Sequence, residues 1–284
     1  MSTIAEILPL AEAALADSGI AQPRREASSL LAFAVGKDKA FLIAHPEYVL
    51  NSDEETHFAD CLARRARREP FQYITGRQEF YGLDFIVTPD VLIPRPETEM
   101  VVEHAIRVLG VESRSRFCEV GVGSGSISIA ILKNMAGANA VGLDVSMPAI
   151  EVARRNAVMH RVDDRLELRE SDVFSALGDE KFNLVVSNPP YIPVKELPSL
   201  QHEVRDFEPK TALTDGADGL AIIRRIVDQS PRHLEPGGHL IMEIGFQQAG
   251  AVRGLLSAAS WRDIDIADDL QGIPRCVIAR RPVD

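Results

Sequence analysis

The sequence predicts an α/β protein: a doubly wound, mostly parallel sheet preceded by a small helical domain. From about residue 94 onward, short apolar strand-like runs alternate with helical patterns. Several of these runs end in glycine-rich or polar segments, as expected where ligands bind at the carboxyl edge of such a sheet. Residues 1–70 instead carry apolar positions at helical spacing, such as Ile4, Ile7 and Leu8.

The helical domain is expected to comprise four or five short helices, because proline and glycine residues interrupt its pattern. The basic run Arg64-Arg65-Ala66-Arg67-Arg68 closes it. These charges suit a solvated helix end, where they complement the helix dipole, and contact with a partner is the alternative. Residues 71–93 are predicted to form a β-hairpin connector, with its turn at Tyr81-Gly82.

Residues 94–284 form the predicted sheet domain, in which each strand is followed by a helix until the last two strands. The expected strands are 116–120, 139–143, 165–169, 182–187, 238–244 and two closing strands around 264–266 and 276–279, and the expected helices are 97–109, 126–135, 147–160, 217–230 and 247–258.

The most informative segment is Asn188-Pro189-Pro190-Tyr191, directly behind the apolar run 182–187. Two prolines end this buried strand, so an amide and an aromatic ring stand at its carboxyl end. The Asn188 side-chain oxygen and the Pro189 carbonyl can accept both N–H groups of a planar amine or amide, on which Tyr191 can stack. The segment is therefore a methyl-acceptor site for a weakly nucleophilic nitrogen, or only a turn in which prolines stop a strand.

A second segment, Glu119-Val120-Gly121-Val122-Gly123-Ser124-Gly125, joins a short apolar strand to a helical pattern. Its three glycines let the backbone approach a ligand where the helix presents free N–H groups, so a cofactor carboxylate or ribose would fit there. Position 126 is serine, so the dinucleotide-binding spacing is not met, and no Gly-Lys-Ser/Thr follows to form a phosphate loop. The alternative is a tight strand-to-helix turn.

Two acidic residues follow the next strands. Asp144 ends the strand 139–143, where it can accept hydrogen bonds from both hydroxyls of a ribose. It could instead cap the helix that starts near residue 147, a role that is also open to Ser146. Asp172 follows the strand 165–169 and, with Val173 beside it, could flank an adenine and bind its exocyclic amine, or it could be only a turn residue.

Taken in order, these segments resemble the S-adenosylmethionine-dependent class I methyltransferases that modify amino or amide nitrogens. Further segments are similar to conserved blocks of the HemK/PrmC family, the release-factor glutamine methyltransferases, so the resemblance covers nearly the whole chain. These segments are 80–85, 92–99, Glu208-Pro209, Ala212-Leu213 and 215–220. The resemblance implies a Rossmann-like, seven-stranded sheet behind a helical substrate-recognition domain.

Members of this family methylate the side-chain amide nitrogen of the glutamine in the Gly-Gly-Gln motif of class-1 peptide chain release factors. The resemblance implies the same reaction here, with S-adenosyl-L-methionine as the cofactor and a release factor as the partner. A similar family that acts on a ribosomal protein typically carries Arg-Ser-Pro-Ile where this chain has Arg95-Pro96-Glu97-Thr98, which favours the release-factor reading.

Site residues follow from the resemblance by position. Those implied to bind the cofactor are Glu119, Gly121, Val122, Gly123, Ser124, Gly125, Asp144, Asp172, Val173 and Asn188. Those implied to bind the substrate are Asn188, Pro189, Pro190 and Tyr191, of which Asn188, Pro189 and Tyr191 are expected to act in catalysis.

Composition narrows the alternatives. The chain has 284 residues, 45% of them hydrophobic and 26% charged, which fits one large and one small globular domain. Its formal net charge of −11 argues against a broad grip on nucleic-acid phosphates and suits a basic partner. A DNA adenine N6-methyltransferase would need a basic groove and a target-recognition segment. A cofactor-binding assembly factor without catalysis is the other rival.

The sequence shows no pattern typical of a disulfide framework, a metal site, a membrane span or a signal peptide. The cysteines Cys61, Cys118 and Cys276 are widely separated and have no neighbouring histidine, so neither a disulfide framework nor a metal site is expected. No apolar run approaches the roughly 20 residues of a membrane span, and the first residues lack the basic start of a signal peptide. A cytoplasmic monomer is therefore expected.

Overall fold

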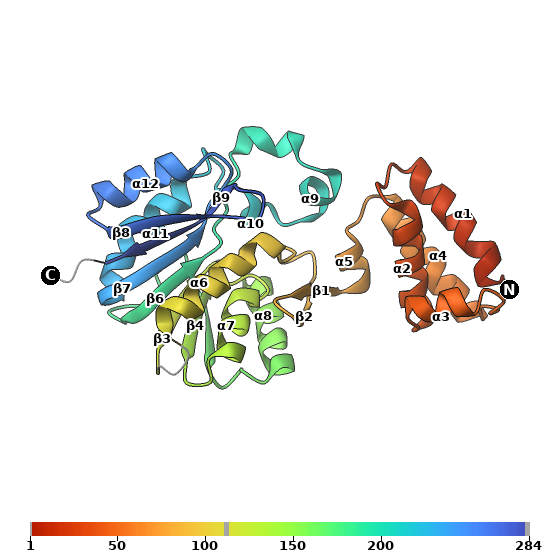
Figure 1. The fold of residues 1–284 in the computed structure, drawn as a ribbon, viewed down its shortest axis with the longest axis horizontal. Helices are drawn as coiled ribbons and strands as arrows, with labels where there is room; N and C mark the ends of the chain where they lie inside the picture. Colours follow the sequence, from red (N-terminus) through yellow and green to blue (C-terminus); the bar gives the residue numbers. More distant parts are fainter. Residues whose placement is uncertain (1, 111–113, 282–284) are drawn as a thin grey trace. The chain divides into compact units, whose positions relative to one another are not determined.

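The computed structural model describes residues 2–110 and 114–281 and divides the chain into two compact units (Figure 1). The first unit comprises Met1–Arg77 and the distant segment Gln201–Phe207, and the second comprises Gln78–Leu200 and Glu208–Asp284. The division falls after Arg77 rather than at residue 70, because the buried Ile74 of one further short helix packs into the helical core.

The first unit is helical. The side chains of Thr3 and Asn51 each accept a backbone N–H at a helix start, and a glutamate three residues on completes a capping box. Buried leucines and Phe58 form the core between these helices. The helices of Met1–Arg77 are α1 (Ile4–Asp17), α2 (Pro23–Val35), α3 (Lys39–Ala44), α4 (Ser52–Ala66) and α5 (Phe71–Thr75).

A buried arginine joins the two sequence segments of this unit. Arg65 is only 5% exposed and donates to the carboxylates of Glu26 and, at 3.0 Å, Glu203. Arg68 donates to the second oxygen of Glu203 at 2.9 Å. Glu203 lies on α9 (His202–Phe207), so this short helix belongs to the helical unit. Arg65 is therefore neither a solvated helix-end charge nor an exposed contact for a partner.

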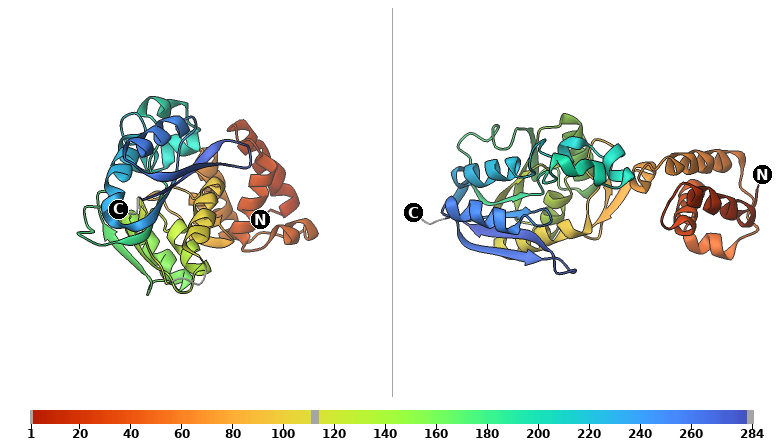
Figure 2. Two further views of the ribbon diagram at one scale, coloured as in Figure 1. Left: turned by 60° about the vertical axis from the view of Figure 1, so that its left-hand side comes forward. Right: turned by 90° about the horizontal axis from the view of Figure 1, so that it is seen from above.

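The second unit is built on a seven-stranded sheet, which confirms the predicted α/β class (Figures 1 and 2). The order across the sheet is β5-β4-β3-β6-β7-β9-β8, in which β9 is antiparallel to both β7 and β8 and the other pairs are parallel. The strands are β3 (Arg116–Val120), β4 (Asn139–Asp144), β5 (Leu166–Glu170), β6 (Phe182–Ser187), β7 (Leu234–Glu243), β8 (Arg262–Asp268) and β9 (Pro274–Arg280). A separate hairpin pairs β1 (Arg77–Phe80) with β2 (Leu83–Ile86).

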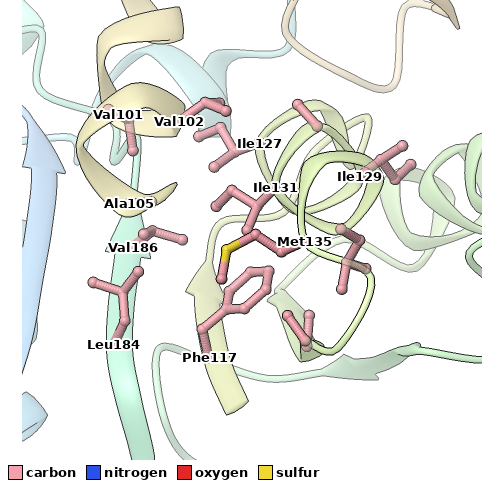
Figure 3. Close-up of a cluster of buried hydrophobic side chains, with 14 of the residues drawn as sticks. Val101, Val102, Ala105, Phe117, Ile127, Ile129, Ile131, Met135, Leu184 and Val186 are labelled. Carbon is pink, nitrogen blue, oxygen red and sulfur yellow. The ribbon is translucent and has the colours of Figure 1, made fainter. Parts of the chain in front are cut away.

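Helices cover both faces of the sheet. Alternate residues of its strands point to opposite sides, and both sides carry apolar side chains that the helices bury. Leu184 and Val186 of β6 pack with α6 (Glu99–Leu109) and α7 (Ser126–Asn134) in the cluster shown in Figure 3. Val185, between them, packs with α11 (Ala221–His233) and α12 (Ala249–Ala258) on the other face. The sheet is thus the middle of three layers. The helix α8 (Met147–His160) connects β4 to β5.

Two predicted elements begin several residues away from their expected starts. The helix expected from residue 217 begins at Ala221, because the Asp215 carboxylate accepts the N–H groups of Ala217, Gly219 and Ala221 and holds the preceding residues as a loop. The strand expected from residue 238 begins at Leu234 instead. The described chain also contains short helices that were not predicted: α5, at the start of the segment expected as a hairpin connector, η2 (Val194–Ser199), α9 and α10 (Lys210–Leu213). A 3-10 turn, η1 (Pro96–Thr98), precedes α6 within the helix expected from residue 97.

Within residues 2–110 and 114–281, no helix is both long and apolar enough to cross a membrane. The same residues contain no group of three or more acidic, histidine or cysteine side chains that could hold a metal ion. The three cysteines are buried and free.

Candidate active site

The sheet order reverses at β3, which pairs with β4 on one side and β6 on the other. Loops at the carboxyl ends of these strands leave in opposite directions, and a ligand crevice forms between them in open α/β sheets. A cavity lies at this edge. The segments and residues that line it include Asp90–Leu92, Pro94, Arg95, Thr98, Glu119–Ser124, Asp144–Ser146, Ser171–Val173 and Ser187–Pro190.

The structure brings most of the predicted site residues to this one cavity. Glu119, the loop residues Gly121 to Ser124, Asp144, Asp172, Val173, Asn188, Pro189 and Pro190 line it. Gly125 and Tyr191 lie next to these segments in the chain but do not line the cavity.

The glycine loop turns sharply between β3 and α7. Gly121, Gly123 and Gly125 all have a positive φ, of 78°, 52° and 81°, which favours glycine. The Gly121 and Val122 N–H groups donate to the Leu143 carbonyl at 2.8 and 2.9 Å, which ties the loop to the end of β4.

The glycines of this loop differ in what surrounds them. A Cβ on Gly125 would lie 3.0 Å from Ile129 Cδ1 and 3.3 Å from the Ala153 Cβ, whereas one on Gly123 would meet nothing within 4 Å. Gly125 therefore lets α7 and α8 approach each other. Gly123, which lines the cavity, leaves space there.

Substitution at these two glycines is expected to separate stability from ligand binding. Gly125→Ala should lower the free energy of unfolding by about 1–3 kcal/mol, because strain at positive φ adds to the close packing against α8. Gly123→Ala carries the backbone strain alone and should cost less stability, but its methyl group faces the cavity and should weaken cofactor binding. Urea unfolding and titration with S-adenosylmethionine, the cofactor that the resemblance implies, measure the two effects. A larger loss of cofactor affinity in Gly125→Ala would contradict this division.

The carboxyl group of Glu119 lies at the glycine-loop side of the cavity. Glu119 is 1% exposed, and its Oε2 accepts from the Ser128 N–H at 2.9 Å and from the Ser128 hydroxyl. Burial raises the pKa of Glu119 to about 8, although the Ser128 donors act in the opposite direction. Such a group gains stabilisation when a cation enters the cavity beside it.

Asp144 holds the loop and the next helix together. Its Oδ2 accepts from the Gly123 N–H at 2.9 Å and its Oδ1 from the Ser146 N–H at 2.9 Å. Burial raises the pKa of Asp144, against these backbone donors. Ser146, not Asp144, is the N-cap of α8, since its hydroxyl accepts from the Ala149 N–H. The helix cap is thus supplied without Asp144, whose carboxyl group stands at the cavity.

The two residues after β5 differ. Val173 is buried at the cavity with φ 55°, a left-handed conformation that is unusual for a β-branched residue. The side chain of Asp172 is 63% exposed and accepts from Arg225 at 2.8 Å, which lowers the pKa of Asp172. Asp172 thus lines the cavity while its carboxylate is engaged by Arg225.

A chain of hydrogen bonds runs behind Asn188. The Asn188 Nδ2 donates to the Thr98 Oγ1 at 3.0 Å, and the Thr98 hydroxyl donates to the Glu243 Oε2 at 2.5 Å. The Tyr191 hydroxyl donates to the Glu243 Oε1 at 2.8 Å. Burial raises the pKa of Glu243 above its ordinary value, while these two hydroxyl donors oppose the rise. The pKa of Tyr191 is raised by burial and by the nearby Glu243, so its hydroxyl keeps its proton.

Close contacts fix the backbone of Tyr191. Its carbonyl accepts from the Gln248 Nε2 at 2.9 Å. A Cβ on Gly219, which has φ 79°, would lie 2.2 Å from that carbonyl oxygen. These contacts hold the Tyr191 backbone in place, and its hydroxyl reaches Glu243.

Sequence reasoning did not assign a role to Thr98 or Glu243. Thr98 stood in the quoted segment Arg95-Pro96-Glu97-Thr98, and Glu243 is the one charged residue in the apolar run 240–244. A single acid within a strand that is otherwise buried is the signal that could have found it.

A glycine loop, one buried and one half-buried carboxyl group and an Asn-Pro-Pro-Tyr segment meet at the switch point of a seven-stranded sheet. This combination of fold and site defines a class I S-adenosylmethionine-dependent methyltransferase. A methyltransferase structure from Pyrococcus furiosus has the same fold, with a TM-score of 0.55 and 15% identity, over 78% of this chain and 98% of that one.

Two family models match the chain: the PrmC N-terminal domain at residues 6–76 and the methyltransferase small domain at residues 99–203. The release factor glutamine methyltransferase of Geobacter sulfurreducens is 44% identical over 98% of this chain and 96% of its own length. That of Koribacter versatilis is 41% identical over 92% of each chain. The chain belongs to the release factor glutamine methyltransferase family.

Proposed function

We propose that this enzyme methylates the side-chain amide nitrogen of the glutamine in the Gly-Gly-Gln motif of class-1 peptide chain release factors. The observation that carries the proposal is the position of Asn188 and Pro189, which line the same cavity as the glycine loop and Asp144. An acceptor nitrogen and a methyl donor can therefore meet there. The name shared by the similar proteins supports the choice of substrate.

S-adenosylmethionine fits the lining of this cavity. The buried Glu119 offers its carboxyl group to the cofactor's ammonium group, and Asp144 offers acceptors to ribose hydroxyls. Gly121 and Gly123 keep the cavity open beside the backbone, while Val173 supplies an apolar surface for the adenine. When bound, the cofactor supplies a methyl group carried by a positively charged sulfur.

The protein's part in the reaction is to orient the amide. An amide nitrogen is a poor nucleophile because its lone pair is delocalised into the carbonyl. The Asn188 Oδ1 and the Pro189 carbonyl would accept its two N–H groups and leave the lone pair directed away from both. Orientation of this kind can contribute about 7–11 kcal/mol to lowering a barrier. As the nitrogen becomes positive, both acceptors bind its N–H groups more strongly, which favours the transition state over the ground state.

The helical unit would bind the release factor. The model match to the PrmC N-terminal domain supports a role separate from the methyltransferase sheet. The formal net charge of −11 favours association with a basic protein surface, such as the face of a release factor that meets ribosomal RNA. The reaction would then take place in the cytoplasm, where translation ends, with the enzyme acting as a monomer.

The test is transfer of labelled methyl from S-adenosylmethionine to purified release factor. A matched substrate carries Gly-Gly-Ala in place of Gly-Gly-Gln, and DNA and ribosomal protein serve as parallel acceptors. Label on the release factor that disappears with that glutamine supports the proposal. Label on DNA or on ribosomal protein instead would assign the substrate to a rival class, and no label on any acceptor would favour a protein that only binds the cofactor.

A further inference from the structure

We propose that Thr98 and Glu243 are positioning residues that hold the Asn188 side chain with its oxygen toward the amide nitrogen of the substrate. This inference rests on the proposed function, in which Asn188 accepts an N–H group of that nitrogen. Neither residue was assigned a role by its sequence motif, and Glu243 does not line the cavity. Both would act through Asn188.

Three separate segments supply the groups. Thr98 ends the short turn η1, Asn188 follows β6, and Glu243 is the last residue of β7, the strand beside β6. Thr98 is 3% exposed and Glu243 is 2% exposed, so water has little access to the bonds between them. A carboxylate buried to this extent is costly unless its oxygens are hydrogen-bonded. The hydroxyl groups of Thr98 and Tyr191 each donate to one of them.

The single proton of the Thr98 hydroxyl determines which group donates and which accepts in each of these hydrogen bonds. Both oxygens of Glu243 accept from hydroxyl groups, those of Thr98 and Tyr191, so the carboxyl group acts only as an acceptor here and takes the single proton of the Thr98 hydroxyl. The Thr98 oxygen can then only accept from Asn188. The Asn188 amide must therefore present its NH₂ group to Thr98, and its oxygen is left for other partners. The buried Glu243 carboxyl group therefore determines that the NH₂ end of the Asn188 amide, and not its oxygen, faces Thr98.

The opposite orientation would harm the reaction. If the Asn188 amide turned over, its NH₂ group would face the N–H groups of the substrate, and two donors would meet. One of the two acceptors that orient the nitrogen would be lost. Asn and Gln side chains can turn over in this way whenever their neighbours accept either end. A glutamine at position 243 would allow it, because its own NH₂ could donate to Thr98 and free the threonine proton for the Asn188 oxygen.

The Tyr191 hydroxyl is the last member of this hydrogen-bonded group. It occupies the second oxygen of Glu243 at 2.8 Å, so the carboxylate is held by two donors from different segments. The chain carbonyl of Tyr191 is in turn fixed by Gln248. In this arrangement the hydroxyl of Tyr191 acts behind the asparagine, on the carboxylate.

The test compares Thr98→Val, which keeps the shape but removes the hydroxyl, with Thr98→Ser, which keeps the hydroxyl, and with Glu243→Gln. Methyl transfer is measured on whichever acceptor the wild-type enzyme labels. Thr98→Val and Glu243→Gln should lower kcat by about 10- to 100-fold, the loss expected for one hydrogen bond in the transition state. Thr98→Ser should stay within about 3-fold of wild type, and the Kd for S-adenosylmethionine should change by less than about 3-fold in all three.

A second readout does not depend on activity. With ¹⁵N-asparagine labelling, the Asn188 side-chain signal is assigned by its loss in Asn188→Ala. Its hydrogen-bonded proton should exchange slowly with solvent in wild type and Thr98→Ser, and fast in Thr98→Val. This readout decides the orientation even if wild-type enzyme labels no release factor, which would reject only the proposed substrate.

Three results would overturn the inference. The first is wild-type turnover in Thr98→Val. The second is an equal loss in Thr98→Ser and Thr98→Val, since a purely structural role at this site would not be rescued by the hydroxyl. The third is fast exchange of the Asn188 proton in the wild-type protein. Thermal unfolding of each variant identifies any that fails to fold, and the exchange rates in wild type and Thr98→Ser then decide.

Discussion

Asn188→Ala is expected to lower kcat for methyl transfer by about 10²- to 10³-fold, the range seen when one oriented hydrogen-bonding group is removed from an active site. The physical reason is that the amide nitrogen loses one of the two acceptors that orient it and that stabilise its developing charge. The Kd for S-adenosylmethionine should rise by less than about 10-fold, because the glycine loop and Asp144 remain. Single-turnover methylation and cofactor titration measure the two quantities.

Asn139→Ala is the matched control for this variant. Asn139 is exposed at the first residue of β4, at the opposite edge of the sheet, so its loss should leave both quantities unchanged. If Asn188→Ala turned over as fast as the control, Asn188 would not be the acceptor residue. If it lost cofactor affinity in proportion to kcat, its role would lie in cofactor binding alone.

Asp144→Ala is expected to raise the Kd for S-adenosylmethionine by about 100-fold or more. Two effects combine: the ribose hydroxyls lose a charged acceptor, and the Gly123 and Ser146 N–H groups lose the carboxylate that fixes the loop. Each hydrogen bond to a charged group contributes about 1.5–3 kcal/mol. At saturating cofactor, kcat should fall much less, since Asp144 does not hold the acceptor nitrogen. Isothermal titration and saturation kinetics measure the two effects.

Asp172→Ala provides the comparison at a second acid of the same cavity. Its carboxylate is largely exposed and engaged by Arg225, so its removal should change the Kd by less than about 3-fold. An equal loss of affinity in the two variants would show that the Asp172 carboxylate binds the cofactor directly.

The sequence alone predicted the fold and the gathering of most candidate site residues at one edge of the sheet, because both depend on local patterns. Parallel strands end at one edge of a sheet, so Asp144 and Asn188, each directly after an apolar run, had to lie near the glycine loop. Strand and helix bounds followed from periodicity within a few residues. The largest departures are the strand that begins at Leu234 and the segment 215–220, where one aspartate side chain holds a loop that a helical pattern had covered.

Partners across long sequence separations could not be predicted. Thr98 is bonded to Asn188 over 90 positions and to Glu243 over 145, and no local pattern carries such pairing. The same applies to Tyr191. Its residue type suggested stacking on a substrate, and the hydrogen bond from its hydroxyl to Glu243, 52 positions away, could not be predicted. Side-chain orientation depends on tertiary neighbours that the chain order does not reveal.

The salt bridges of Glu203 bear on how this family can be cut and recombined. Because α9 belongs to the helical unit, that unit is discontinuous in the sequence. A fragment ending at Arg77 would leave Arg65 and Arg68 without this carboxylate. A chimera that exchanges only the first 77 residues between relatives would combine a foreign arginine pair with the original acidic partner. The two stretches therefore form one structural module, and a chimera that keeps this module intact has to carry residues 201–207 along.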